Sequence, residues 1–175
     1  MLSDGTMVSV ETLSIVFTGM SISLAAFYYI STLRNAQRTQ QLTLETRQAQ
    51  LFMQIYDRWS SIEMTKMEWE LSNWEWDDFD DYVSKYDSDV ESISLRSVLG
   101  RQFEGIGVLI KRGLIDPALV DDLMSASILG YWEKWGPVVK EWRVRRNIPQ
   151  ASEYQEYLYQ TIKAIAEKQH TELET

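Results

Sequence analysis

With 175 residues, of which 45% are apolar, the chain is long enough to bury the core of one domain, and general disorder is excluded. It has no cysteine, which excludes disulfides, thiolate nucleophiles and cysteine-ligated metal sites. The segment from Glu63 to Glu91 alone accounts for the whole net charge of −9. Because phosphate binding needs clustered basic residues, we expect no nucleic-acid partner.

The first predicted element is a membrane-spanning helix from Leu13 to Leu33. This stretch has no charged residue and no proline, and it matches the roughly 20 residues that cross a bilayer. No basic residue precedes it, which argues against a signal peptide. A buried helix of a soluble protein stays an alternative, because the stretch contains several serines and threonines.

The charges on either side of this stretch predict its orientation. Asp4 and Glu11 precede it, and all 17 basic residues follow it. The positive-inside tendency therefore predicts an anchor in the cell membrane, with residues 1–12 outside and the C-terminal domain in the cytoplasm. Arg34 and Arg38, just beyond the apolar stretch, are candidate contacts with lipid headgroups.

Small residues recur along the predicted span at helical spacing. Such residues let helix backbones approach closely in lipid, where packing drives association. They form a candidate contact face for a second copy or for a larger membrane partner, or they stand there without any partner. The candidate residues are Ser14, Thr18, Gly19, Ser21, Ser23 and Ala25.

A polar helical stalk is predicted for residues 34–50, and a helical domain for residues 51–170 followed by a frayed tail, 171–175. The helix that leaves the membrane is expected to continue to Trp69. Its apolar positions recur at intervals of three, four and seven residues, which is typical of one buried helix face. These positions are Leu44, Leu51, Ile55, Trp59 and Ile62.

The stretch "EWELSNWEWDDFDDY", residues 68–82, holds three tryptophans and seven carboxylates. One interpretation is structural: Ser72 and Asn73 end a helix, Asp77 and Asp78 begin a short one, and the aromatic residues Trp74, Trp76 and Phe79 pack the turn against the domain. The other is a docking surface for a basic partner. Its candidate residues are Trp74, Trp76, Asp77, Asp78, Asp80 and Asp81.

A further helix is predicted from Ser88, whose spacing to Glu91 is that of a capping box, to the left-handed residue Gly113. The glycines inside this helix are costly for a helix and predict a close approach of a neighbouring one. They are Gly100, Gly105 and Gly107.

Asp116 followed by Pro117 predicts the start of the next helix. Pro137 is expected to kink or stop it, with a shorter helix from there to about Arg146. A last helix is predicted from Ser152, with Gln155 at the capping-box position. No segment alternates between apolar and polar residues, so the fold class is all-α, an antiparallel helical bundle behind one membrane helix.

Chemical motifs are few. Glu167 and His170 form one Glu-x-x-His pair, whereas a di-iron site needs two such pairs and two further glutamates, and this is the only histidine. We therefore predict no catalytic residue, no metal site and no cofactor. The basic stretch 140–146 is interpreted as pairing with the acidic segment or following a helix end, rather than binding lipid. Tyr131 and Trp135 are interpreted as core residues rather than as a ligand cage.

The apolar span, the Gln- and Arg-rich stalk, "FEGIGVLIKRGLID" (103–116) and "YWEKWGPVVKEWR" (131–143) together resemble a prokaryotic family of small single-pass membrane proteins known only as a domain of unknown function. The resemblance implies a helical cytoplasmic domain behind one span. It supplies no activity and no functional residues.

The functional prediction is a single-pass membrane protein that acts by protein–protein contact, as an accessory or scaffolding subunit of a membrane complex or as a self-associating anchor, and not as an enzyme. Its partners would be membrane lipid and either another protein or a second copy. The alternative is a membrane-anchored helical sensor or effector that binds a small ligand. A third class is an enzyme using carboxylates such as Glu68, Glu70 or Glu75 with a divalent metal.

Overall fold

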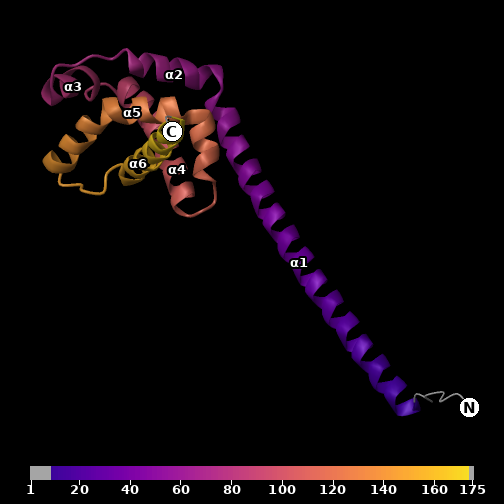
Figure 1. Cartoon of the computed structure of the whole chain (residues 1–175). Coiled ribbons are helices and arrows are strands. Elements are labelled where there is room, and N and C mark those ends of the chain that lie inside the picture. Colours follow the sequence, from indigo (N-terminus) through magenta and orange to yellow (C-terminus); the bar gives the residue numbers. More distant parts are fainter. Residues whose placement is uncertain (1–8, 174–175) are drawn as a thin grey trace, which may run out of the picture. The chain divides into compact units, whose positions relative to one another are not determined.

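The computed structural model describes residues 9–173, and these residues form helices joined by turns, with no strand among them. The predicted all-α fold is therefore confirmed (Figure 1). The helices are α1 (Val10–Trp59), α2 (Ile62–Ser72), α3 (Phe79–Tyr86), α4 (Val90–Lys111), α5 (Pro117–Arg145) and α6 (Glu153–Leu173). The chain divides into two compact units, the first ending at Thr46 and the second beginning at Arg47. Each unit is described by itself.

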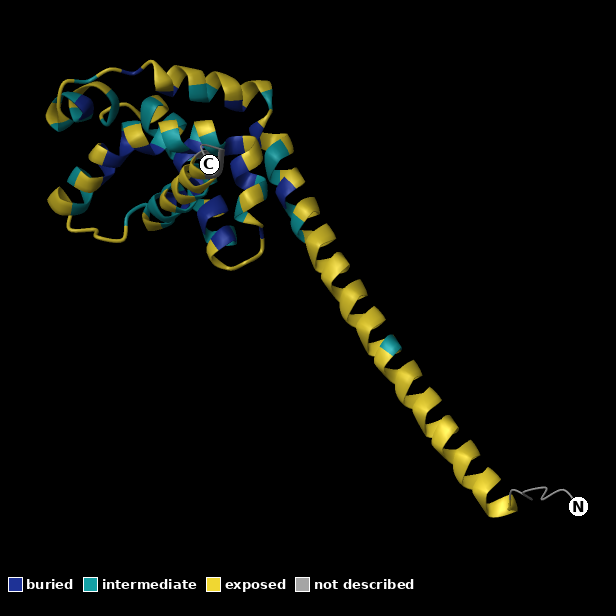
Figure 2. Cartoon of the chain, in the orientation of Figure 1, coloured by how far each residue is buried: buried dark blue, intermediate teal, exposed yellow. Residues whose placement is uncertain are grey.

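The first unit consists of the N-terminal part of α1, whose side chains are exposed along the apolar stretch except at Ser31, which is half-buried (Figure 2). Among the described residues, α1 is the one helix long and apolar enough to cross a membrane. Four of its hydroxyl groups, on Thr18, Ser21, Ser23 and Thr32, donate hydrogen bonds to carbonyls one turn back, as Thr18 does to Ser14 at 2.8 Å and Ser23 does to Gly19 at 2.9 Å. Because these four hydroxyls are satisfied within the helix, their residues are compatible with an apolar surrounding.

The second unit is a bundle in which α6 packs against both α4 and α5, and α2 packs against α4. Helices α4 and α5 are antiparallel, because Arg96 lies over the Trp142 ring while Phe103, two turns later in α4, contacts Tyr131. Every helix of this unit contributes to one core, which also takes in Ile115 from the turn before α5 and the last turns of α1. Its most deeply buried side chains are Phe52, Leu71, Tyr82, Leu99, Phe103, Ile106, Ile115, Val120, Met124, Leu158 and Ile162.

The turn between α4 and α5 forms as its sequence predicts. Gly113 adopts the left-handed conformation with φ of 66°, which a residue with a side chain rarely adopts. Asp116 then caps α5, because its carboxylate accepts a hydrogen bond from the Ala118 N–H at 2.9 Å, and Pro117 occupies the first helical position. This turn brings α5 back along α4.

The long first helix ends ten residues earlier than predicted, at Trp59 instead of Trp69. Ser61 begins α2 by accepting a hydrogen bond from the Met64 N–H at 3.2 Å. Two residues of the predicted apolar face, Leu44 and Ile62, are exposed, and Phe52 is fully buried in their place. The consecutive serines after Trp59 are the sequence signal that indicates this break.

The predicted stop at Pro137 is wrong, because α5 continues through it as one helix of 29 residues, whereas a kink there stays a prediction. Proline removes one backbone hydrogen bond and costs roughly 3 kcal/mol in a helix interior. Packing on both sides outweighs this cost here. Val138 and Val139 are buried after the proline, and Gly136 before it leaves room for the Trp132 ring, which an added Cβ would approach to 3.1 Å.

The starts of α4 and α6 also differ from the predicted caps. Asp89, not Ser88, caps α4 by accepting from the Ser92 N–H at 2.8 Å. Ser152 has φ of 56°, so it is not the extended cap residue predicted for α6. Instead, the Glu104 carboxylate of α4 accepts hydrogen bonds from the first N–H groups of α6, including that of Gln155 at 2.9 Å. A long-range carboxylate thus does what a local serine was predicted to do.

The glycines of α4 divide into two kinds. A Cβ added at Gly107 would lie 2.1 Å from the carbonyl oxygen of Tyr154 in α6, and one at Gly100 would lie 3.1 Å from side-chain atoms of Gln155 and Tyr131. A Cβ at Gly105 would meet nothing within 4 Å. The predicted close approach is therefore confirmed at Gly100 and Gly107 and is wrong at Gly105.

Candidate functional site

The loop between α2 and α3 is held by aromatic packing. Trp74 stacks on Tyr86 with ring centroids 4.1 Å apart, and the Trp76 ring lies 5.0 Å from that of Trp135 in α5. The ammonium group of Lys134 donates hydrogen bonds to the carbonyls of Ser72 and Trp74 at 2.6 Å. Phe79, at the start of α3, is likewise packed against the core. The structural interpretation of this stretch is confirmed.

Three of the four aspartates predicted to dock a partner also have structural roles through their carboxylates. Asp78 caps α3 by accepting from the Asp81 N–H at 2.9 Å. Asp81 pairs with Lys85 at 2.7 Å, and this hydrogen bond lowers the pKa of its carboxyl group. Its carboxylate also accepts a hydrogen bond from the Asp77 N–H. Asp80 pairs with Arg145 of α5. The docking role stays a prediction, and any test of it has to separate charge from these contacts.

Helical geometry divides the six predicted membrane contact residues between two faces of α1. At about 100° per residue, Gly19 and Ser23 point roughly 150° away from the mean direction of the other four. Gly19 and Ser23 lie in a shallow groove whose other residues are large and apolar: Val16, Met20, Leu24 and Phe27. Arg34 and Arg38 are exposed one turn apart beyond the apolar stretch. Their contact with lipid headgroups stays a prediction.

Two arginines at the end of α5, Arg145 and Arg146, pair with the acidic segment, in agreement with the favoured interpretation, whereas Arg143 pairs with α6. Arg146 binds Asp87 at 2.5 Å, and Arg143 binds Glu156 of α6 at the same distance. Asp87 is the notable partner, because its side chain is only 6% exposed and it also lies 3.5 Å from Arg96. Two guanidinium groups therefore share one buried carboxylate.

Metal ligation has no support in the described part of the chain. No group of three or more histidine, aspartate or glutamate side chains there is placed to hold a metal ion. The side chain of His170 lies outside the described residues.

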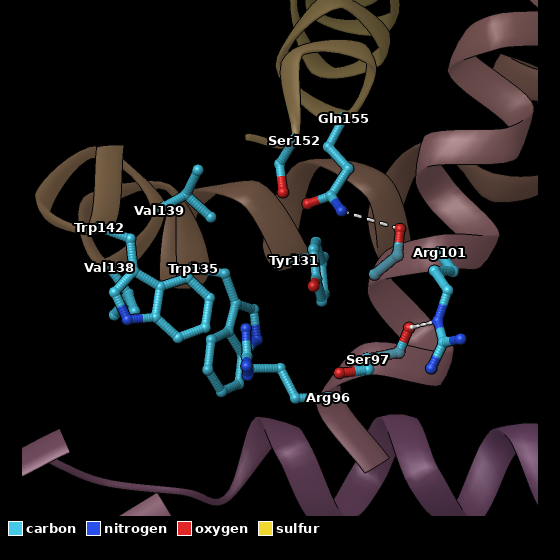
Figure 3. Close-up of a pocket in the computed structure, with 11 residues that line it drawn as sticks. Arg96, Ser97, Arg101, Tyr131, Trp135, Val138, Val139, Trp142, Ser152 and Gln155 are labelled. Atoms are coloured by element: carbon cyan, nitrogen blue, oxygen red, sulfur yellow. Dashed lines mark hydrogen bonds between the residues drawn. The ribbon is translucent and has the colours of Figure 1, made fainter. Parts of the chain in front are cut away.

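A cavity of about 220 Å³ lies between α4, α5 and the start of α6 (Figure 3). Trp135, Val139 and Trp142 form its apolar walls, and Arg96 and Tyr131 bring polar groups. Its remaining lining residues are Ser97, Gly100, Arg101, Val138, Ser152 and Gln155. Burial raises the pKa of the Tyr131 hydroxyl well above its ordinary value, so this group is neutral and can donate a hydrogen bond.

Three polar atoms of the cavity residues are buried and have no hydrogen-bond partner in the described protein: Arg96 Nε, Trp142 Nε1 and Gln155 Oε1. A buried polar group without a partner costs about 1–3 kcal/mol. The orientation of the Gln155 amide is fixed, because its nitrogen donates to the Gly100 carbonyl at 2.8 Å. The amide oxygen is therefore directed away from that bond, and Figure 3 shows Gln155 and Arg96 on opposite sides of Tyr131.

Residues 14–162 match a protein family described as Domain of unknown function (DUF4760). The chain belongs to this family. The match confirms the predicted resemblance, and it extends from the apolar part of α1 into α6, so that it includes both the groove of α1 and the cavity. No curated protein and no solved structure matches the chain.

No local sequence pattern predicts the cavity, although a ligand cage at Tyr131 and Trp135 was one of the alternatives. These two residues do line the cavity, together with residues of α4 and α6 that no local pattern connects to them. The available signal was Gly100, whose missing side chain leaves space for the Tyr131 hydroxyl and the Gln155 amide.

Proposed function

We propose that the protein is a single-pass, membrane-anchored interaction protein, an accessory or scaffolding subunit that joins a second copy or another membrane protein. The observation that carries the proposal is the apolar stretch of α1, which is exposed except at Ser31 and long enough to span a bilayer. The charge distribution favours an N-terminus outside the cell membrane and the helical domain in the cytoplasm, with Arg34 and Arg38 at the headgroups.

The groove around Gly19 and Ser23 is the proposed contact face within the membrane. A glycine and a serine one turn apart let a second helix approach closely, and the larger residues beside them supply packing surface. Both copies can present this face to each other, which suits a symmetric pair.

Leucine at Gly19 is expected to weaken self-association in a bilayer about tenfold, equivalent to about 1.4 kcal/mol, because the side chain fills the groove. The measurement is energy transfer between labelled full-length copies in lipid vesicles as protein density is varied. Ala25→Leu is the matched control, because it adds bulk on the opposite side of the same helix. Equal energy transfer in wild type and Gly19→Leu would contradict the proposed face.

Neutralising Glu75 and Asp77 together is expected to release a basic partner protein that co-purifies with the full chain in mild detergent. Both side chains are exposed, and neither caps a helix or forms an ion pair with another helix in the described residues. The fold should therefore survive, with a change in the midpoint of thermal unfolding of only a degree or two. The control pair is Glu63→Gln with Glu70→Gln on α2. Retention of the partner by the variant with Glu75 and Asp77 neutralised would contradict a docking site in the loop between α2 and α3.

The second candidate function is that of a membrane-anchored sensor or effector that binds a small ligand. The specific observation in its favour is the cavity, whose walls combine aromatic rings with buried polar atoms that have no partner in the described protein. Ligand-binding pockets in proteins typically combine apolar and aromatic walls with a small number of polar groups. The two functions are compatible, because one uses α1 and the other the helical bundle.

A further inference from the structure

We propose that the cavity between α4, α5 and α6 binds a small organic acid, with the anionic group of the ligand at Arg96 and a hydrogen-bond donor of the ligand at the amide oxygen of Gln155. This inference rests on the second candidate function and names the chemical class of the ligand. It does not depend on self-association of α1.

The charge of the cavity favours an anion. Its lining includes two arginines, Arg96 and Arg101, and no aspartate or glutamate. Arg96 has Asp87 as its neighbour, but that carboxylate lies closer to Arg146, at 2.5 Å against 3.5 Å. One negative charge is thus divided between two guanidinium groups, and the cavity wall keeps a net positive charge. Guanidinium groups in partly buried sites bind carboxylates with directed hydrogen bonds.

The unpartnered polar atoms of the cavity residues determine which hydrogen-bonding groups the ligand carries, in addition to its charge. The Arg96 side chain is 15% exposed, and its Nε is a buried donor without a protein partner. Trp142 Nε1 is a second such donor, and it belongs to the ring on which Arg96 stacks at 3.9 Å. Gln155 is 8% exposed and offers the one acceptor of this set. All three atoms are closed to solvent in the ligand-free protein, and a ligand that satisfies all three carries an acceptor group at one end and a donor at the other.

The size and walls of the cavity limit the ligand further. A volume of about 220 Å³ lies below the roughly 300–1,000 Å³ of pockets that hold drug-sized molecules. The flat face of Trp135 and the side chain of Val139 suit a compact apolar body between the two polar ends. A single-ring hydroxy acid has these features, and 4-hydroxybenzoate is a suitable probe.

The test is isothermal titration calorimetry with the full-length protein in lipid nanodiscs. We expect 4-hydroxybenzoate to bind, and the neutral 4-hydroxybenzamide to bind at least tenfold more weakly, because the amide lacks the charge that Arg96 and Arg101 attract. Adding salt should weaken the binding of the acid and leave that of the amide unchanged.

The decisive variant is Ser97→Glu, which places a carboxylate on the cavity wall without removing a core side chain. It should weaken binding of 4-hydroxybenzoate at least tenfold. Ser94→Glu is the matched control, because it adds the same charge one turn earlier in α4, at an exposed position outside the cavity, and it should bind as the wild type does. Thermal unfolding of both variants verifies that each is folded.

Three results would overturn the proposal: no heat of binding with 4-hydroxybenzoate at millimolar concentration, equal binding of the acid and the amide, or equal affinity in Ser97→Glu and Ser94→Glu. The first of these would leave the buried polar atoms without a ligand as their partner. Equal binding of the acid and the amide would overturn the anionic class of the ligand and still leave a small-molecule site in the cavity, so failure of this inference is distinguishable from failure of the second candidate function. None of the three results bears on energy transfer between copies in vesicles.

Discussion

Alanine at Gly107 is expected to destabilise the helical bundle by about 2–3 kcal/mol. Its Cβ would lie 2.1 Å from the carbonyl oxygen of Tyr154 and 2.8 Å from the carbonyl carbon. Both are backbone atoms at the start of α6, so no side-chain rotation relieves the clash, and α6 has to move away from α4. Such a movement would also disturb the hydrogen bond from the Gln155 N–H to Glu104.

Alanine at Gly105, two residues earlier in the same helix, is expected to stabilise the bundle by about 0.5–1 kcal/mol. Nothing lies within 4 Å of an added Cβ there, and alanine has the higher helix propensity. Urea unfolding of the full chain in detergent, followed by tryptophan fluorescence, measures both variants. Stabilities of the two variants within about 1 kcal/mol of each other would contradict the close packing of α4 against α6.

These two glycines show how far the sequence predicts the fold. The helical repeat, the turn at Gly113 and the start at Asp116 depend on neighbouring residues, and the structure confirms them. Which glycine of α4 faces another helix depends on where α6 crosses α4. That crossing is part of the tertiary structure, and neighbouring residues in the sequence do not determine it. The same holds for Pro137, because burial of Val138 and Val139 keeps the helix continuous through a residue that disfavours it locally.

The candidate site was predictable only in part. The aromatic packing of the loop between α2 and α3 follows from its composition, and the apolar span follows from its length. The cavity does not, because Arg96, Trp142 and Gln155 come from three helices with no shared motif. The burial of Asp87 was equally hidden, since an aspartate next to a helix start usually stays in water.

Asparagine at Asp87 is expected to destabilise the bundle by about 3 kcal/mol, whereas asparagine at Asp80 should cost less than about 1 kcal/mol. Both aspartates pair with arginines at the end of α5, so the substitutions are chemically matched. They differ in exposure, which is 6% for the Asp87 side chain and 74% for that of Asp80. Removing the buried charge leaves Arg96 without a counter-charge in a poorly hydrated place, while Arg145 stays in water. Thermal and urea unfolding measure both, and equal losses would show that Asp87 is hydrated in solution.

The Asp87 variant also connects stability with the proposed ligand. Without the aspartate, the positive charge of Arg96 is no longer offset, so the cavity of the folded Asp87→Asn variant should hold 4-hydroxybenzoate more tightly than the wild type does. A ligand that binds only the folded state raises its stability in proportion to the logarithm of its concentration over Kd. The probe is therefore expected to raise the unfolding midpoint of Asp87→Asn by more than that of the wild type. It should raise the midpoint of Asp80→Asn by the same amount as that of the wild type. An equal rise of the unfolding midpoint in all three proteins would show that Arg96 does not bind the anion.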